Sequence, residues 1–529
     1  LDDPVPDYPG DSASQHDRYY DIVHLCPPLA MDAAVAWWCD GDDRWLTMAS
    51  RIADAFARWQ HWRAPKHLPL PADLSSATLG LQMAVVYDLL YDRLAPTTRE
   101  AIAAAILRHV VHHIQPQRID RCWWSWAYDG NWSWVVLGGS GAAALAVLPE
   151  HGDEARPALE TAAGHLQRSI DHLRTDGSWR EGVSYCMYGL TNAMVLLEAL
   201  ANAGDDRLAA HRSLDALDDF ALLTMLAPHT PPNFGDSGHT AGAHPVMYAR
   251  AARTQRGDMQ HYCDTQGAAG SLAIAYRDAA LSATPARFDP PSRCWREIGW
   301  AVMRSDWDDA DAVVLATKAG SVAGGHQHWD CGTFILRAFG AELIGEPGIG
   351  VYSREYHSGR ALLKTTAVHN CMTFDEQEQQ PGEFFEAHLT DFETRPGYDM
   401  AKMVLTHAYD HPDVKRYNRL FFLLRPGVVV LVDEVRAHCG HNSTTGTMLQ
   451  SRLHTFGEIT LRDFDAVVEV DHAAMIVRNI MPPSTVGLGD WYAAYSVGRH
   501  EGLTSRRDQQ DDQRLKYLNI RMQAARDPA

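Results

Sequence analysis

The short run Asp289-Pro290-Pro291-Ser292 divides the sequence into two halves with different patterns of apolar residues. From about residue 17 to about residue 290, apolar residues recur every three or four positions, which is typical of amphipathic helices. After this run the apolar residues come in short β-like stretches. The sequence therefore predicts a helical domain over residues 1–290, followed by a β domain over residues 291–529.

The first half carries helix signals as well as helical spacing. Thr97 followed by Glu100 has the spacing of a capping box just after Pro96, and Gly204 follows an apolar segment, where helices commonly stop. About seven or more helices joined by short polar turns are expected, which predicts a bundle or a toroid. The segments with helical spacing are 45–62, 79–94, 102–114, 142–148 and 191–203.

The second half contains several short runs that resemble strands. The clearest is 419–433, because two apolar runs flank Pro426-Gly427, a typical turn. Strands joined by such turns pair antiparallel, and a series of them packs as two sheets, so we expect an antiparallel β-sandwich. The expected strands are 312–315, 332–336, 420–424, 428–432 and 467–470.

The composition limits the class of protein. A chain of 529 residues is too long for one hydrophobic core, and at about 150 residues per domain it holds roughly two to four domains. The formal net charge of −20 argues against nucleic acid as a partner, because binding to phosphate depends on clustered lysine and arginine. A polyanionic substrate is still compatible with this charge, since a cleft can be locally basic.

Cysteines and apolar runs limit the cellular setting. The nine cysteines are scattered without a C-x-x-C pair, which indicates neither a zinc ribbon nor a dense disulfide framework. The sequence begins at Leu1 rather than at methionine, so we expect a processed product or a trimmed chain. No apolar run approaches the roughly 20 residues that span a bilayer, and no membrane segment is expected.

The segment Gly324-Gly325-His326-Gln327-His328-Trp329-Asp330 places two imidazoles and a carboxylate close together. It precedes the apolar run 334–336, so we interpret it as part of a β-strand on which His326 and His328 face the same side. Two histidines on one side suit a metal ion or a proton transfer. The alternative is a pair of solvated or core histidines on an edge strand.

Three other motifs accompany this segment, and together they resemble a known family. They are Gly130-Asn131-Trp132-Ser133-Trp134-Val135, Asp176-Gly177-Ser178-Trp179-Arg180-Glu181-Gly182-Val183-Ser184-Tyr185-Cys186-Met187-Tyr188-Gly189 and His369-Asn370. In this order, over about residues 80 to 435, the four motifs resemble the heparinase II/III superfamily of polysaccharide lyases. The resemblance implies an N-terminal α/α toroid, which is an incomplete barrel, followed by antiparallel β-sheets.

The resemblance also implies cleavage of a uronic-acid polysaccharide by β-elimination. Such an enzyme removes the proton at C5 of the sugar and expels the 4-linked oxygen, which leaves an unsaturated ring. The neighbouring carboxylate must be neutralised, because negative charge develops on it. Asn131 is our candidate for this role, since an amide donates hydrogen bonds without acting as a base. The alternative is a turn or helix-capping asparagine after Asp129-Gly130.

Two tyrosines and a histidine are candidates for moving protons. Tyr185 and Tyr188 are three residues apart and share a face if this segment is helical. We favour Tyr188 as the phenol that protonates the leaving oxygen. For one sugar epimer the same phenolate would also take the C5 proton, and for the other epimer His326 would take it from the opposite side. The alternative is that both tyrosines are core aromatics of a helix.

Other residues are candidate contacts for the sugar chain. Trp126 and Trp132 belong to a tryptophan-rich segment whose rings would line a groove, although most of these tryptophans are expected to fill a helical core. Arg180 and His239 are further candidates. Asp236, three residues before His239, is in the same segment, and a residue that caps a loop is an equally good interpretation of it.

In the resembling lyases a divalent metal ion lies in the β domain. Carried over by position, its ligands here are His328, Glu346 and His369, a set that suits zinc first and manganese second. The family usually has aspartate where this sequence has Glu346, so the geometry or the metal is expected to differ. We expect a structural ion that fixes the loop of His326, because elimination needs no activated water.

The motifs predict a secreted or periplasmic bacterial lyase that acts on a glycosaminoglycan of the hyaluronan, chondroitin or heparan type. Alginate or another polyuronate is the alternative substrate. It is less favoured because alginate lyases typically have histidine at the position of Trp132. A glycoside hydrolase that uses Asp176 and Glu181 is a second class, and their spacing within one turn argues against it. A third class, a non-catalytic sugar-binding protein, would not need the amide, the phenol and the imidazole together.

Overall fold

The computed structural model describes residues 4–239, 244–286, 288–307, 309–350, 362–437, 447–480, 485–491 and 515–523, which form two compact units. The helical unit comprises Leu1–Gly177, Tyr185–Asp219 and Gly242–Ala286. The β unit comprises Ser178–Ser184, Phe220–Ala241 and Arg287–Ala529. Two short segments that precede residue 290 in the sequence therefore belong to the β unit, and they bring Arg180 and His239 into it.

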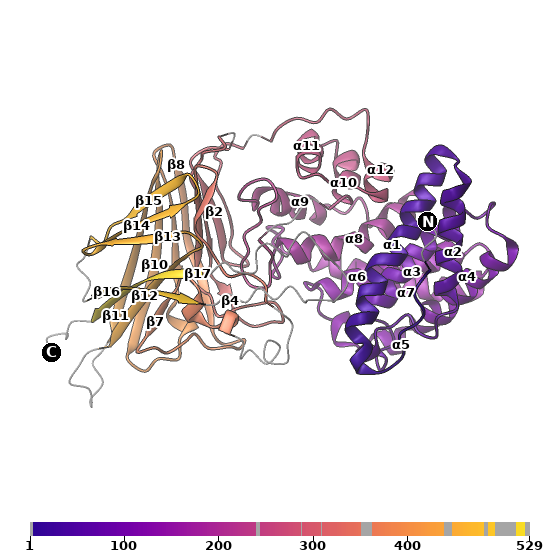
Figure 1. Cartoon of the computed structure of the whole chain (residues 1–529), viewed down its shortest axis with the longest axis horizontal. Helices are drawn as coiled ribbons and strands as arrows, with labels where there is room; N and C mark the ends of the chain where they lie inside the picture. The colour runs from indigo at the N-terminus through magenta and orange to yellow at the C-terminus, as the bar shows by residue number, and fades with distance from the viewer. Residues whose placement is uncertain are drawn as a thin grey trace. The chain divides into compact units, whose positions relative to one another are not determined.

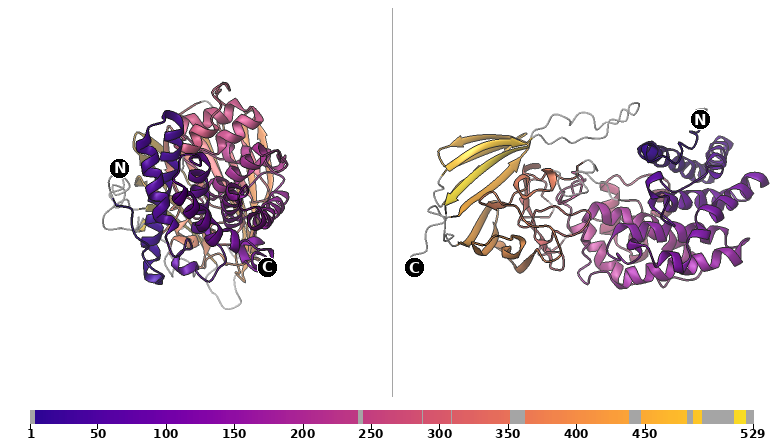
Figure 2. Two further views of the ribbon diagram at one scale, coloured as in Figure 1. Left: turned by 90° about the vertical axis from the view of Figure 1, so that its right-hand side faces the viewer. Right: turned by 90° about the horizontal axis from the view of Figure 1, so that it is seen from below.

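The first half of the chain is helical, as the spacing predicts. Its helices and 3-10 helices are η1 (Ala13–Gln15), α1 (His16–Asp40), α2 (Asp43–Ala57), η2 (Pro65–His67), α3 (Leu74–Leu89), α4 (Pro96–His109), η3 (Val111–His113), α5 (Pro116–Ile119), η4 (Trp123–Ser125), α6 (Asn131–Val147), α7 (Gly152–Asp171), α8 (Val183–Asn202), α9 (Ser213–Leu223), α10 (Met247–Thr254), α11 (Gly257–Thr265) and α12 (Ser271–Tyr276). They pack side by side in the helical unit (Figures 1 and 2).

Close packing fixes α6 within the helical unit. It contacts α3 and α7. At two of its glycines the neighbouring backbones leave no room for a side chain: a Cβ at Gly139 would lie 2.3 Å from the Ala77 carbonyl oxygen of α3, and one at Gly138 would lie 2.4 Å from the Ala193 nitrogen of α8. The start of α6, where Asn131 and Trp132 lie, is therefore held by the packing of its body.

The two helix boundaries predicted from capping signals have different outcomes. Gly204 ends the segment of α8 with a positive φ of 97°, which confirms the predicted stop. The capping box expected at Thr97 and Glu100 is wrong. Instead, α4 starts at Pro96, whose fixed φ suits the first helical position, and Ala95 precedes it without a side-chain cap.

The β unit is built from antiparallel strands. The strands are β1 (Arg293–Trp295), β2 (Trp300–Arg304), β3 (Val314–Lys318), β4 (Gly320–Ser321), β5 (Phe334–Ala338), β6 (Ala341–Ile344), β7 (Met372–Phe374), β8 (Glu386–Arg395), β9 (Tyr398–Val404), β10 (Val414–Leu424), β11 (Val428–Ala437), β12 (Met448–Thr455), β13 (Glu458–Arg462), β14 (Asp465–Val470), β15 (Ala473–Val477), β16 (Thr485–Trp491) and β17 (Leu515–Gln523). The four described sheets have the orders β1-β2-β3-β5-β6, β11-β10-β9-β8-β4, β16-β17-β12-β7 and β13-β14-β15.

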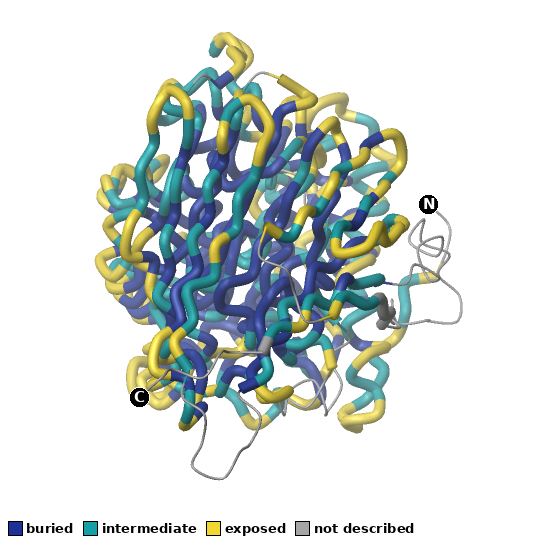
Figure 3. Tube along the Cα trace, turned by 90° about the vertical axis from the view of Figure 1, so that its left-hand side faces the viewer, coloured by how far each residue is buried: buried dark blue, intermediate teal, exposed yellow. Residues whose placement is uncertain are grey.

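Strands β10 and β11 confirm the hairpin predicted for residues 419–433. Leu424 pairs with Val428 across the Pro-Gly turn, and Phe421 pairs with Leu431 farther along. Phe421 also contributes to an apolar core with Phe334 of β5. Figure 3 shows buried residues along the strands and exposed residues concentrated in their connections. The sheets thus give the loops between them a rigid support.

The prediction that a strand carries His326 and His328 is wrong. Strand β5 begins only at Phe334, and the residues from 322 to 333 form a loop. Gly324 and Gly332 both have positive φ angles, 118° and 89°, in a region of backbone conformation that β-strands do not use. The alternation of a strand therefore cannot be what directs the two imidazoles.

Two helical stretches are long and apolar enough to cross a membrane by length and composition, Ala13–Asp40 and Val183–Asn202. The sequence predicts no membrane-spanning segment, because scattered polar residues interrupt both stretches. Their mean hydropathy is nevertheless high. Of the apolar window in Val183–Asn202, 61% is buried inside the structure, and buried core helices pass the same test. The stretch Ala13–Asp40 lies near the N-terminus, where signal sequences also pass it.

Candidate functional site

The loop that carries His326 docks on a second loop of the β unit, residues 233–239. The Asp236 backbone nitrogen donates a hydrogen bond of 3.1 Å to the His326 carbonyl oxygen. Gly235 makes this approach possible, since its φ is +60° and a Cβ there would lie 2.4 Å from the same oxygen. The two loops are therefore joined through their backbones before any side chain is considered.

Asp236 binds both histidines of the motif at once. His326 Nδ1 lies 2.9 Å from Asp236 Oδ2, and His328 Nε2 lies 2.9 Å from Asp236 Oδ1. Burial opposes the charge on Asp236, but the hydrogen bonds from the two imidazoles and the charge of Lys364 outweigh it and hold the pKa of this carboxyl well below its usual range. The predicted convergence of His326 and His328 is thus produced by a shared carboxylate.

The contact with Asp236 fixes the tautomer of His326. An ionised carboxylate only accepts hydrogen bonds, so Nδ1 carries the proton and Nε2 is the nitrogen at which a further proton could bind. The imidazole is 18% exposed, and Glu181 Oε1 lies 3.8 Å from its Nε2. A base whose ring is oriented by a buried carboxylate is the arrangement that general base catalysis requires.

Arg180 lies beside the same loop. Its backbone oxygen accepts a hydrogen bond of 2.7 Å from Gln327 Nε2, and its guanidinium carbon lies 3.6 Å from the position that a Cβ would take on Gly324. The β unit therefore places a cation next to His326. A guanidinium there suits the carboxylate or sulfate of an acidic sugar.

His239 lies deeper, between two loops. Its Nδ1 is 3.1 Å from Asn233 Nδ2, and its Nε2 is 3.3 Å from the Pro347 carbonyl oxygen. Burial lowers the pKa of His239, which keeps the ring neutral. These contacts tie the loop of Asp236 to the loop that follows β6, and the contact of His239 with a substrate stays a prediction.

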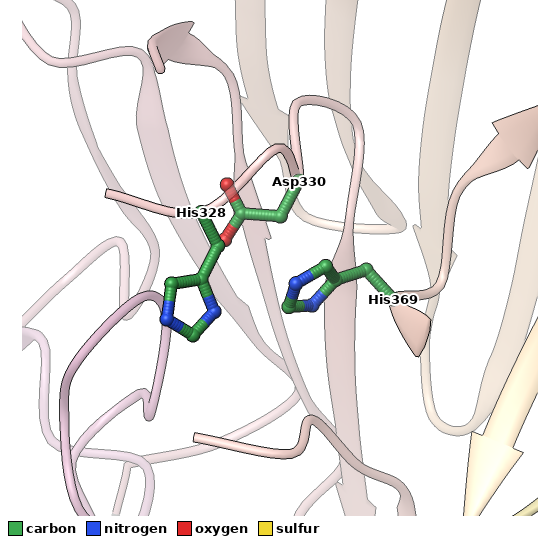
Figure 4. A group of neighbouring side chains, drawn as sticks. All are labelled: His328, Asp330 and His369. Atoms are coloured by element: carbon green, nitrogen blue, oxygen red, sulfur yellow. The ribbon is translucent and has the colours of Figure 1, made fainter. Parts of the chain in front are cut away.

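A group of potential metal ligands lies behind His326. His328, Asp330 and His369 are all buried, and one ligand atom of each lies within 4.8 Å of the others (Figure 4). The predicted set had Glu346 in place of Asp330. Among the described residues, the structure therefore brings together a different carboxylate, which comes from the same short motif as His328.

Glu346 instead lies behind His369. It accepts a hydrogen bond from His369 Nδ1, and its other oxygen accepts hydrogen bonds from Thr333 and from the backbone and side chain of Asn370. Burial disfavours the imidazolium, but the Glu346 charge outweighs it and raises the pKa of His369. Each histidine of the group thus has an orienting carboxylate, Asp236 for His328 and Glu346 for His369, as in many metal sites.

The donor set fits a divalent ion. Burial lowers the pKa of His328, so its ring is neutral and offers Nδ1 once Nε2 donates to Asp236. Asp330 binds the ammonium of Lys318 through Oδ1 at 2.5 Å, while its Oδ2 has no hydrogen-bond partner among the described residues. His369 Nε2 lies 3.1 Å from the Leu363 carbonyl oxygen, so an ion bound there would displace a proton.

The helical unit holds the predicted amide and the tryptophans. Asn131 is the first residue of α6 and only 1% exposed, and the cap position belongs to Gly130, so the capping alternative does not apply. The Trp132 ring lies 5.3 Å from the ring of Trp123, measured between centroids. Trp126 is 53% exposed, and its Nε1 donates a hydrogen bond of 2.7 Å to the Asp120 carbonyl oxygen.

The two tyrosines lie on one face of α8, as predicted for a helical segment. Both Tyr185 and Tyr188 are partly exposed. Burial, and then the charge of Asp73, raise the pKa of Tyr188 well above that of a free phenol. Its hydroxyl therefore stays protonated at neutral pH, which suits a proton donor better than a base.

Each unit gathers its own part of the predicted set. The β unit brings together His326, Arg180 and His328 with two carboxylates that sequence reasoning did not assign to this role, Asp236 and Glu181. Asp236 is 90 residues from His326 in the sequence, and no spacing rule connects them. The prediction that Asn131 and Tyr188 surround one sugar ring with His326 stays a prediction.

Comparisons with known proteins agree on the family. Residues 289–513 match the family model described as Heparinase II/III-like, C-terminal. A search of curated proteins found no match. The match and the shared fold agree with the predicted resemblance, a helical region followed by antiparallel sheets.

Three solved structures show the same fold. The chain is similar to heparan sulfate lyase HepC from Pedobacter heparinus, with 14% identity, a TM-score of 0.64, and coverage of 98% of this chain and 75% of the other. It is similar to a structure of heparinase III, with 14% identity, a TM-score of 0.60, and coverage of 99% and 80%. It is also similar to the heparinase III BT4657 gene product, with 16% identity, a TM-score of 0.59, and coverage of 98% and 79%.

Proposed function

We propose that this heparinase II/III-like chain cleaves a uronic-acid glycosaminoglycan by β-elimination, with an incomplete α/α toroid and a β-sandwich as its two parts. The observation that carries the proposal is the His326–Asp236 pair, in which a buried carboxylate holds Nδ1 of a partly exposed imidazole at 2.9 Å. Such a pair presents Nε2 as a base in a fixed orientation. Elimination needs one base of this kind and no activated water.

In the proposed reaction His326 Nε2 removes the proton at C5 of the uronic acid. Asp236 stabilises the imidazolium that forms, because its charge lies on the opposite nitrogen. The C5 carbanion is stabilised by its carboxylate, whose charge Asn131 and Arg180 neutralise. The electron pair then forms the C4–C5 double bond and breaks the bond from C4 to the linking oxygen.

Tyr188 donates the proton that the leaving oxygen takes up. A proton donor must be protonated at neutral pH, and the raised pKa of Tyr188 keeps its phenol in that form. The same raised pKa disfavours a phenolate that removes the C5 proton. The division of labour with His326 as base and Tyr188 as acid is therefore favoured, and Tyr185 on the same face of α8 is the second candidate for the acid.

We also propose a structural divalent ion, zinc first and manganese second, held by His328, Asp330 and His369 with Glu346 as the orienting carboxylate. An ion there would fix the loop of His326, and no step of the elimination uses it. Removing the ion with a chelator should lower the melting temperature together with activity. A melting curve that is unchanged in metal-free protein would contradict the structural role.

Glycosaminoglycans are the favoured polymers, and alginate or another polyuronate is the alternative. The solved structures with this fold include proteins named heparan sulfate lyase and heparinase III, which supports the preference. A polymer of this size meets the enzyme outside the cytoplasm, so we propose a secreted or periplasmic bacterial protein.

Product absorbance tests the proposal. The protein is incubated with hyaluronan, chondroitin sulfate, heparan sulfate and alginate, and ultraviolet absorbance and new reducing ends are measured for each. We expect both signals to rise together on at least one glycosaminoglycan, because elimination creates a conjugated double bond. New reducing ends without absorbance would indicate hydrolysis, and no product from any polymer would contradict the lyase proposal.

A further inference from the structure

A second histidine–carboxylate pair lies in the helical unit, outside the residues assigned so far. Asp73 is completely buried at the N-cap of α3. Its carboxylate accepts hydrogen bonds from the backbone nitrogens of Ala64 and Ser76, both at 2.9 Å, and lies 3.0 Å from His67 Nδ1. A carboxylate held in this way cannot turn away from the imidazole.

The pair directs one nitrogen of His67 outward. Because Asp73 accepts, Nδ1 of His67 carries a proton, and Nε2 is left on the far side of the ring. The His67 side chain is 23% exposed, whereas its partner is fully buried. When an acidic group binds at Nε2, a ring protonated on both nitrogens donates one N–H to Asp73 and the other to the ligand.

Aromatic rings continue from His67 toward the surface. The His67 ring lies edge-on to Trp132 and to His16, with 5.3 Å between centroids in each pair. Trp132 lies at the same distance from Trp123, which is 60% exposed. Flat, partly exposed rings in a row form a surface on which sugar rings stack. The neighbouring Trp124 and Trp134 are fully buried, so the tryptophan-rich segment is not exposed as a whole.

We propose that His67, held by Asp73, binds the anionic group of an acidic sugar that stacks on Trp132. The inference rests on the proposed function for the class of ligand, a uronic-acid polymer, and it adds a binding residue in the helical unit. His67 is a substrate-binding residue in this assignment, and Asp73 is a positioning residue that acts through it.

Three features of the surroundings agree with this assignment. Trp132 directly follows Asn131, the proposed amide that neutralises the sugar carboxylate. Asp73 also raises the pKa of Tyr188, so this carboxylate acts electrostatically on the proposed proton donor within the same unit. The exposed Lys66 precedes His67 and adds positive charge in a chain whose net charge is −20.

The test compares two oligosaccharides that differ only in charge. Binding of an acidic hexasaccharide and of its carboxyl-reduced, desulfated counterpart is measured by titration calorimetry for the wild type and for His67→Gln. We expect His67→Gln to weaken binding of the acidic hexasaccharide by about tenfold or more, because a charge-assisted hydrogen bond is lost. Binding of the neutral counterpart should not change.

A matched control uses another histidine of the helical unit. His112 contacts Glu154 at 2.5 Å on the exposed surface. His112→Gln should leave both affinities unchanged. Asp73→Asn keeps an oxygen for the N-cap of α3 and removes the charge behind His67, so it should reduce the preference for the acidic hexasaccharide without a loss of the neutral one.

Each result decides the assignment. Equal weakening for the acidic and neutral hexasaccharides in His67→Gln, or no weakening for either, overturns it. In turnover, the same variant should raise KM with kcat unchanged. If the wild type cleaves no polymer but His67→Gln still loses binding of the acidic hexasaccharide, the lyase proposal fails and the His67 subsite stands. If the wild type cleaves a polymer and His67→Gln binds the acidic hexasaccharide normally, the His67 subsite fails and the lyase proposal stands.

Discussion

The two units hold their candidate residues by different means. In the helical unit Asn131 and Tyr188 lie on α6 and α8, whose positions are set by close helix packing. In the β unit His326 and His369 lie on loops, and buried carboxylates hold their rings. The comparison teaches that individual buried carboxylates orient His326 and His369 in the β unit, whereas the packing of helix backbones positions Asn131 and Tyr188 in the helical unit.

The largest effect is therefore expected at Asp236. Asp236→Ala leaves two imidazoles without their shared acceptor in a buried site, so we expect the free energy of unfolding to fall by about 3 to 5 kcal/mol. Cleavage should fall by about 10²- to 10⁴-fold, because the base loses its orientation. Denaturant titration and the rate of absorbance increase measure the two effects.

The control for this substitution is an exposed ion pair. Asp205 binds Arg207 on the surface of the helical unit, and Asp205→Ala should change the free energy of unfolding by less than about 0.5 kcal/mol. If Asp236→Ala were no more disruptive than this control, the carboxylate would not organise the β-unit site.

Tyr188 should show the opposite behaviour, a loss of rate without a loss of structure. Tyr188→Phe removes only a hydroxyl from a helix face, so we expect cleavage to fall by about 10²- to 10⁴-fold while the melting temperature stays close to that of the wild type. Tyr185→Phe is the matched variant and should lose less than about tenfold. A larger loss in Tyr185→Phe than in Tyr188→Phe would exchange their proposed roles.

The carboxylates around His369 can be separated by their effect on metal content. Asp330→Asn removes a proposed ligand, whereas Glu346→Gln alters only the residue that orients His369 and should lower metal affinity by about 10- to 100-fold. We expect the larger loss in Asp330→Asn, measured as bound zinc after dialysis against buffered free metal. The reverse order would restore Glu346 as the ligand.

The smallest effect is the pH dependence of stability that Asp236 contributes. Its folded-state pKa is lowered, so its contribution is complete above the unfolded value of about 4 and is lost as the pH falls below that value. The difference in unfolding free energy between wild type and Asp236→Asn should therefore be constant from pH 7 to about pH 5 and shrink in more acidic solution. A difference that grows on acidification would contradict the lowered pKa.

Much of the helical unit could be predicted because helical spacing is local. The three-residue separation of Tyr185 and Tyr188 gave their common face once the segment was helical, and the Pro-Gly turn gave the β10–β11 hairpin. The start of α4 could not be predicted in the same way. Pro96 competes with Thr97 for the first turn, and its fixed backbone angle decides the outcome.

The β-unit site could be predicted only in part. The motifs indicate His326, His328 and His369, but the sequence predicts a strand where the structure has a loop, because nothing in the sequence indicates the positive φ angles of Gly324 and Gly332. The sequence offers Asp236 only as a residue that caps a loop, and it does not include Asp330 among the predicted metal ligands. Whether a carboxylate orients a histidine or joins it as a metal ligand depends on contacts between distant segments, and sequence spacing does not encode these contacts.

The most direct test of the account is a kinetic isotope effect at C5. A uronic-acid oligosaccharide that carries deuterium at C5 is compared with the unlabelled one in the wild type, by the initial rate of absorbance increase. Removal of that proton by His326 predicts slower cleavage of the deuterated substrate, and a residual rate in His326→Gln that is far lower for both. Equal rates for the two substrates in cleavage that yields no unsaturated product would contradict elimination.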